Sequence, residues 1–235
     1  MNKHMTSVRL LLRRKITARF FTTVLFVCGA VAQVQAQGED ARQAVLDAAT
    51  AMGGVERIQS LRTLRLRGYG HEAYQDGGSE ITTEVAAPEK MTNLAAYERV
   101  IDVPNARTRV KARAFRAFVF AARAMMQGQP LHQVLDGAVA YDVSATGTPR
   151  RAAEVAARQR RMELLAQPVM ALRAALDPAS TLAALRMQDG LRLVDIRTAD
   201  AAQFTLALDP QSKLPAWVQW VGPHENLGEL RYRTE

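Results

Sequence analysis

Apolar residues recur at helical spacing near residue 40 and at alternate positions through much of the remaining chain. The stretch Ala41–Met52 carries an apolar stripe at helical spacing, and Gly53-Gly54 after it supplies a stop signal. Val55–Leu61 predicts one further helical turn. Between Thr63 and Tyr69 leucines alternate with arginines, which indicates a strand with one buried face.

Alternation and turn residues continue downstream. We predict strands over residues 80–85, 91–102, 107–113, 131–135 and 138–143, with turns at 76–78, 104–105 and 136–137. One of these strands presents a comb of alternate cations, formed by Arg107, Arg109, Lys111 and Arg113. We interpret the comb as a solvated outer face, with phosphate binding as the alternative.

The period changes to that of a helix between residues 114 and 126. Flexible Met and flat Phe side chains adapt to variable apolar partners. The stripe therefore gives a candidate wall or lid of an apolar cavity, formed by Phe115, Phe118, Val119, Met125 and Met126. Core packing is the commoner use of such a stripe.

A charged helix is predicted from Pro149 to Leu165, and Pro168 ends or kinks it before a short helix that runs to Leu176. This segment carries the arginines Arg150, Arg151, Arg158, Arg160 and Arg161. We expect them on a solvated outer side of the helix, with contact to anionic lipid head groups as the alternative.

The last part of the chain alternates apolar and polar residues between turns. It predicts an antiparallel meander over residues 182–187, 191–197, 203–208, 217–221 and 230–234. In that meander Trp217 and Trp220 are expected to pack in the core or at its rim, with ligand stacking as the alternative. The elements together predict one α+β domain with antiparallel strands, whose sheet curls around the helices.

Residues 1–36 have the organisation of a secretory signal peptide. They hold six cations and no acid, followed by the apolar run Phe20–Ala32 and the small-x-small triplet Val34-Gln35-Ala36. We expect cleavage after Ala36 and a periplasmic or secreted domain over residues 37–235. A twin-arginine route through Arg13-Arg14 and lipidation of Cys28 are the weaker alternatives, since bulky Val27 precedes the cysteine.

Most of the net positive charge lies in the predicted signal peptide. The chain carries a formal charge of +8, but taking the six signal cations from its 31 leaves 25 basic residues against 23 acidic ones. We therefore predict no nucleic-acid partner. Cys28 is the single cysteine, so the mature domain has neither a disulfide nor a thiolate metal site.

Several turn sequences have a familiar order along residues 40–235. They are Gly53-Gly54 after a helix, Ile58–Leu61, Arg67–Gly70, Leu206–Pro215 and Asn226–Gly228. This order resembles periplasmic lipoprotein carriers of the LolA and LolB type. It is more similar still to the LolA-like domain that precedes the catalytic domain in some exported metallo-β-lactamase-fold hydrolases and zinc peptidases. The resemblance implies an incomplete antiparallel barrel, covered by helices, around an apolar cavity that takes acyl chains.

The sequence contains no recognisable catalytic constellation. His71, His132 and His224 lie singly on distant segments, and there is no Gly-x-Ser-x-Gly elbow or phosphate-binding glycine loop. We therefore predict no catalytic residue, no metal ligand and no cofactor in this chain.

Two functional hypotheses remain open. In the first, the protein is an exported non-catalytic module that binds a lipid, an acyl chain or another apolar molecule, with peripheral membrane contact left open. In the second, it is the accessory domain of an exported metal-dependent hydrolase whose active site lies beyond residue 235. The end of the chain within a predicted strand, at Arg231–Glu235, favours the second hypothesis. The sequence does not specify the oligomeric state.

Overall fold

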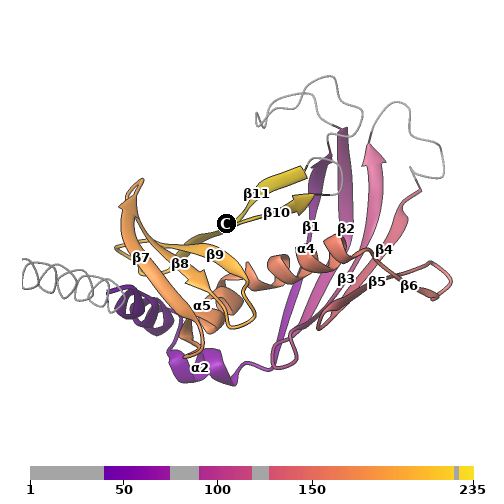
Figure 1. Ribbon diagram of the computed structural model, residues 1–235. Helices are drawn as coiled ribbons and strands as arrows, with labels where there is room; N and C mark the ends of the chain where they lie inside the picture. The colour runs from indigo at the N-terminus through magenta and orange to yellow at the C-terminus, as the bar shows by residue number, and fades with distance from the viewer. Residues whose placement is uncertain (1–39, 75–89, 118–126, 225–227) are drawn as a thin grey trace, which may run out of the picture.

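Two antiparallel sheets and a few helices make up the fold (Figure 1). The computed structural model describes residues 40–74, 90–117, 127–224 and 228–235. The prediction of an α+β protein with antiparallel strands is confirmed. The predicted signal peptide, the hairpin at residues 76–85 and the stripe from residue 118 onward lie outside the described residues.

The first sheet has six strands in chain order, each antiparallel to its neighbour. They are β1 Thr63–Tyr74, β2 Lys90–Asp102, β3 Arg107–Ala117, β4 Gln129–Asp136, β5 Val139–Val143 and β6 Pro149–Arg151. A bulge interrupts β2, where the register with both neighbours shifts around Ala96, whose φ is 50°.

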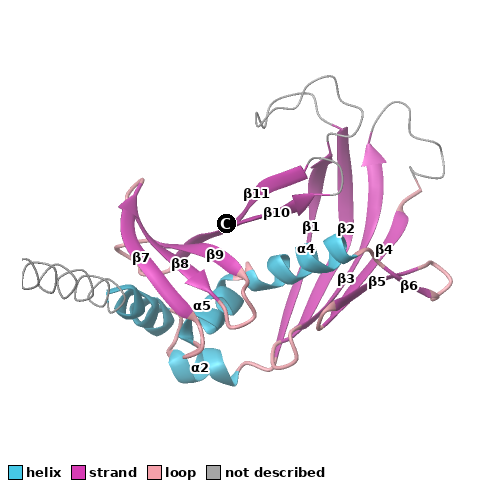
Figure 2. Cartoon of the chain, in the orientation of Figure 1, coloured by secondary structure: helices cyan, strands magenta, loops and turns pink. Residues whose placement is uncertain are grey.

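The second sheet is the predicted meander. Its five strands are β7 Thr181–Gln188, β8 Leu191–Arg197, β9 Gln203–Leu208, β10 Pro215–His224 and β11 Gly228–Thr234. All pairs are antiparallel (Figure 2). The predicted turn at Asp189-Gly190 joins β7 to β8, and both of its residues have positive φ.

The first helix follows the predicted start and stop signals. Residues 40–51 are helical, and the helix ends in a Schellman motif: Gly54 N–H donates to the carbonyl of Ala49, and Gly53, at φ 106°, donates to Thr50. The other helices are α2 Val55–Ser60, α4 Glu154–Leu165 and α5 Pro168–Leu176.

The apolar core has two parts. The larger part packs residues 40–51, α2 and α5 against one face of the second sheet, where Ile196, Leu206 and Val218 are buried. The smaller part packs Leu164 and Met170 against Ile101 and Leu135 of the first sheet. Helix α4 contacts both sheets, through β4 and β5 on one side and β10 on the other.

A buried arginine joins α4 to the first sheet. Arg160 Nη1 donates to the carbonyl oxygens of Val134 at 3.2 Å and Tyr141 at 3.1 Å, and Nη2 donates to Oδ1 of Asp142 at 2.5 Å. Its side chain is only 10% exposed. The prediction that Arg160 lies on a solvated outer side is therefore wrong, because its donors meet acceptors that the strands present beneath the helix.

Two predicted helical stretches are instead strands. Residues 114–117 continue β3, where Ala114 pairs with both Leu94 and Gln129. Pro149–Arg151 forms β6 at the sheet edge, where a proline without an N–H is tolerated. In both places strand pairing overrides the local helical spacing, so α4 begins only at Glu154.

The Arg160 contacts predict a clear stability effect. We expect Arg160→Met to lower the free energy of unfolding by about 2–3 kcal/mol, because the carbonyl acceptors beneath α4 lose their donor. Arg158→Met on the same helix is the control; Arg158 is exposed, and a surface change of this kind stays within about 0.5 kcal/mol. Urea denaturation of both variants measures the difference. Equal midpoints would contradict the role of Arg160.

A second prediction concerns the turn before β4. Gly128 and Gly190 both have φ of +78°, but a Cβ on Gly128 would lie 2.5 Å from Cε1 of Phe115, whereas one on Gly190 meets nothing within 4 Å. We expect Gly128→Ala to cost about 1–2 kcal/mol more than Gly190→Ala, since overpacking adds to the shared backbone strain. Differential scanning calorimetry measures both; identical melting temperatures would show that the Phe115 ring moves aside without cost.

Candidate functional site

An apolar cavity of about 380 Å³ lies between α4 and strands β10 and β11. Met162 of α4 lines one side, and Trp220, Pro223 and Tyr232 line the other. A cavity of this size lies within the range of small-molecule pockets, which are mostly apolar with a few polar groups at the edge.

The Trp220 and Tyr232 rings form the wall of this cavity that faces the sheet. They are direct cross-strand partners and stack with centroids 5.2 Å apart and planes 10° apart. Trp220 belongs to the main core, and Tyr232 packs against it. The Tyr232 hydroxyl donates to the carbonyl of Pro223 at 3.3 Å. The wall is therefore held rigidly by packing on its far side.

Charged groups mark the rim of the apolar cavity. Arg161 pairs with Asp200, in the turn between β8 and β9, and this contact ties α4 to the second sheet. Arg158 lies about one helical turn before Arg161. It also lines the cavity and has no polar partner within the described part of the chain.

A second, polar cavity of about 440 Å³ lies along the flank of α4 that faces the first sheet. Gln133, Asp142 and Arg150 line it from the strands, and Gln159, Arg160 and Glu163 line it from the helix, with Arg151 and His224 at its edge. Gln159 lines both cavities, and the β10 neighbours Pro223 and His224 line one cavity each. The two cavities therefore adjoin at Gln159, and we refer to them together as the trench.

Strand register explains why polar side chains gather beneath α4. Arg99, Val110, Gln133, Asp142 and Arg150 are successive cross-strand partners and so share one face of the first sheet. Arg99 Nη2 donates to Oε2 of Glu163 at 3.3 Å, and Gln159 donates to Oε1 of the same carboxylate at 3.2 Å. Both oxygens of Glu163 are therefore engaged by protein groups.

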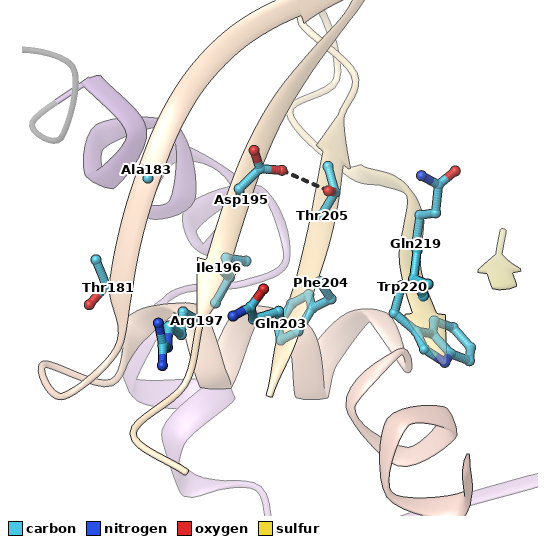
Figure 3. A pocket seen from close by; sticks show the side chains of 11 residues that line it. Thr181, Ala183, Asp195, Ile196, Arg197, Gln203, Phe204, Thr205, Gln219 and Trp220 are labelled. Atoms are coloured by element: carbon cyan, nitrogen blue, oxygen red, sulfur yellow. Dashed lines mark hydrogen bonds between the residues drawn. The ribbon is translucent and has the colours of Figure 1, made fainter. Parts of the chain in front are cut away.

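The largest hollow of the three lies elsewhere, on the outer face of the second sheet (Figure 3). It measures about 480 Å³ and is lined from the four neighbouring strands β7 to β10. Its only acid is Asp195, which accepts from Thr205 at 2.7 Å and from Arg186 at 2.5 Å. One sheet forms its whole floor and its carboxylate is already bound at both oxygens, so we place the site in the trench.

The basic comb of β3 also forms a surface, on the face of the first sheet opposite α4. Glu98 lies within it, 2.9 Å from Nε of Arg67 and 3.7 Å from both Arg65 and Arg109. The hydrogen bond from Arg67, together with the charges of Arg65 and Arg109, holds the pKa of Glu98 below its usual value. Arg109 of the comb thus shares this acid with Arg65 and Arg67 of β1.

The candidate site residues of the 114–126 stripe lie in two places. Phe115 is in β3, where alternation puts it on the face of Arg113, whose guanidinium carbon lies 5.9 Å from the ring centroid. Its ring contacts Gly128 and is not part of the trench. Phe118, Val119, Met125 and Met126 lie outside the described residues, so their assignment to a cavity stays a prediction.

The three histidines remain separate in the structure. His71 is exposed in β1, His132 lies in β4 and His224 at the end of β10. Partial burial, together with Lys111 and Arg109, lowers the pKa of His132. Within the described residues no group of three or more His, Cys, Asp and Glu side chains is arranged to hold a metal ion. None of the described helices is both long and apolar enough to cross a membrane.

Comparison of the chain with protein-family models, curated proteins and solved structures finds no match. The trench therefore has to be interpreted from its own geometry and chemistry.

Of the residues in the apolar cavity wall, the sequence pointed to Trp220 but not to Met162 or Tyr232. Met162 stands among charged residues of a helix, with no signal that it faces a cavity. Tyr232 alternates with Arg231 and Arg233 in β11, and its position opposite Trp220 follows only from the strand register.

Tyr232 gives a spectroscopic test of this geometry. Burial, and secondarily the charge of Glu163, raises the pKa of the Tyr232 phenol above the ordinary value of about 10. The neutral phenol is favoured in the fold, so its contribution to stability is present below the ordinary pKa and is lost as pH rises through the folded pKa. We expect the difference in absorbance at 295 nm between the wild type and Tyr232→Phe to titrate later than the other tyrosines. Titration together with them would contradict the buried position.

Proposed function

We propose that this protein is an exported, non-catalytic domain that binds an apolar chain in the trench beside α4. The observation that carries the proposal is the apolar cavity walled by Met162, Trp220 and Tyr232. Although Trp220 is only 5% exposed, the two stacked rings and the flexible thioether of Met162 give an alkyl chain an apolar wall that requires no fixed ligand shape.

The position of the Trp220 side chain supports the proposal. Trp220 is held by core packing on one side, yet its ring still lines a cavity, and apolar surface left next to a void is a favourable place for an apolar ligand. The predicted secretory signal at residues 1–36 also supports the proposal, because a module exported to the periplasm or outside the cell would be placed to shield apolar chains from water.

We further propose that the two sheets and the helices form the incomplete barrel implied by the resemblance to LolA-type carriers. Contact of α4 with both sheets supports this arrangement, since a helix enclosed between two sheets leaves clefts along its flanks. The ligand then lies along α4, between the helix and the second sheet.

The two tryptophans allow a direct binding test. They lie on opposite faces of β10: Trp220 lines the cavity, and Trp217 lies on the other face beneath the Arg233 guanidinium, 4.5 Å from its ring centroid. The chain has two tryptophans, so Trp217→Phe leaves Trp220 as the sole emitter. We expect a monoacylglycerol with a brominated chain to quench most of its fluorescence on binding, because bromine quenches only at contact range.

Trp220→Phe is the matched control, since its remaining Trp217 lies outside the trench and should keep its emission. Met162→Gln in the Trp217→Phe background should weaken binding about tenfold, which corresponds to about 1.4 kcal/mol. Quenching of Trp217 but not of Trp220, or no quenching in either variant, would refute the proposal.

A further inference from the structure

We infer that the ligand of the trench is an anionic amphiphile, a single-chain lipid with a carboxylate or phosphate head group. Its apolar chain lies beside Trp220, and its head group lies in the adjoining polar cavity, at the guanidinium of Arg150. This inference rests on the proposed function, and it adds a charge requirement that an apolar cavity alone does not impose.

The polarity of the trench changes sharply across Gln159. On one side of this residue the lining is dominated by Met162, Trp220 and Tyr232, and on the other it is dominated by arginines, acids and glutamines. An alkyl chain gains nothing in the polar cavity, and a charged head group is costly in the apolar one. A molecule that fills both cavities must itself be apolar at one end and polar at the other.

The sign of the head group follows from the groups left without partners. Both acids of the polar cavity are occupied: Asp142 accepts from Arg160, and Glu163 accepts from Arg99 and Gln159. Arg160 in turn is bound by Asp142 and two carbonyls. Arg150 and Arg151 have no polar partner in the described part of the chain, so the unpaired charges of the polar cavity are cationic.

Arg158 extends this cationic capacity to the rim of the apolar cavity. It also lacks a partner among the described residues and lines the apolar cavity. Arginine presents donors in a planar fork that matches carboxylate and phosphate oxygens.

The outer comb of the first sheet is the competing cationic surface, but it fits this ligand less well. Its Arg109 shares Glu98 with Arg65 and Arg67 of β1, and its Arg107 pairs with Asp136 at 2.6 Å. None of the comb residues lines the apolar cavity beside α4.

The test measures the affinities of three probes for each variant, using Trp220 emission in the Trp217→Phe background. The probes share one brominated chain and differ in head group: a neutral monoacylglycerol, a fatty acid and a lysophosphatidic acid. We expect at least one anionic probe to bind about tenfold or more tightly than the neutral probe. Whichever anionic probe binds more tightly identifies the head group as carboxylate or phosphate.

Arg150→Gln combined with Arg151→Gln should reduce this preference to about onefold while leaving the affinity of the neutral probe unchanged. The control removes the same two charges elsewhere, with Arg42→Gln and Lys111→Gln, which are exposed and lie outside the trench. It should retain the preference. Melting temperatures of both double variants verify that each is folded.

The possible outcomes distinguish failure of the anionic head-group inference from failure of the proposed function. Equal binding of neutral and anionic probes, or a preference that survives in the Arg150 and Arg151 variant, overturns the anionic head group and leaves the apolar site in place. A parallel loss of both affinities in that folded variant also overturns it, because the arginines then act on the trench as a whole. Failure of every probe to quench Trp220 refutes the proposed function itself.

Discussion

The position of helix α4 between the two sheets is the constraint on which the rest of the structure depends. Leu164 packs the helix into the smaller core, and charged contacts hold it as well: Arg160 reaches the carbonyls beneath it, Glu163 pairs with Arg99, and Arg161 pairs with Asp200. A helix fixed by polar groups on its flanks cannot seal itself against a sheet as an apolar helix does. The cavities along α4 follow from that mode of attachment.

The parts of the fold predicted correctly are those whose information is local. The meander from Thr181 onward alternates cleanly, and turn residues such as Asp189-Gly190 separate its strands. Residues 114–117 and Pro149–Arg151 were predicted as helix, but they pair with other strands: the first with β2 and β4, the second with nearby β5. Local spacing carries no record of such pairing.

The candidate site was less predictable than the fold. Burial of Arg160 depends on carbonyl oxygens supplied by β4 and β5, and sequence pattern treats an arginine among polar neighbours as solvated. Strand alternation does predict that Trp217 and Trp220 lie on opposite faces of β10, because they are separated by an odd number of positions. Only the strand register adds that Trp220 meets Tyr232 across to β11.

The stack of Trp220 on Tyr232 contributes both to the folded core and to the wall of the proposed binding site. One face of Trp220 completes the larger core, and its ring also lines the trench, so the ligand would pack on the wall that holds the last two strands together. A ligand that binds only the folded chain raises its stability by mass action. In the proposed function, an apolar chain would fill the void beside α4 and gain contacts that the empty fold lacks. The arginines beyond Gln159 would then favour ligands with an anionic head group.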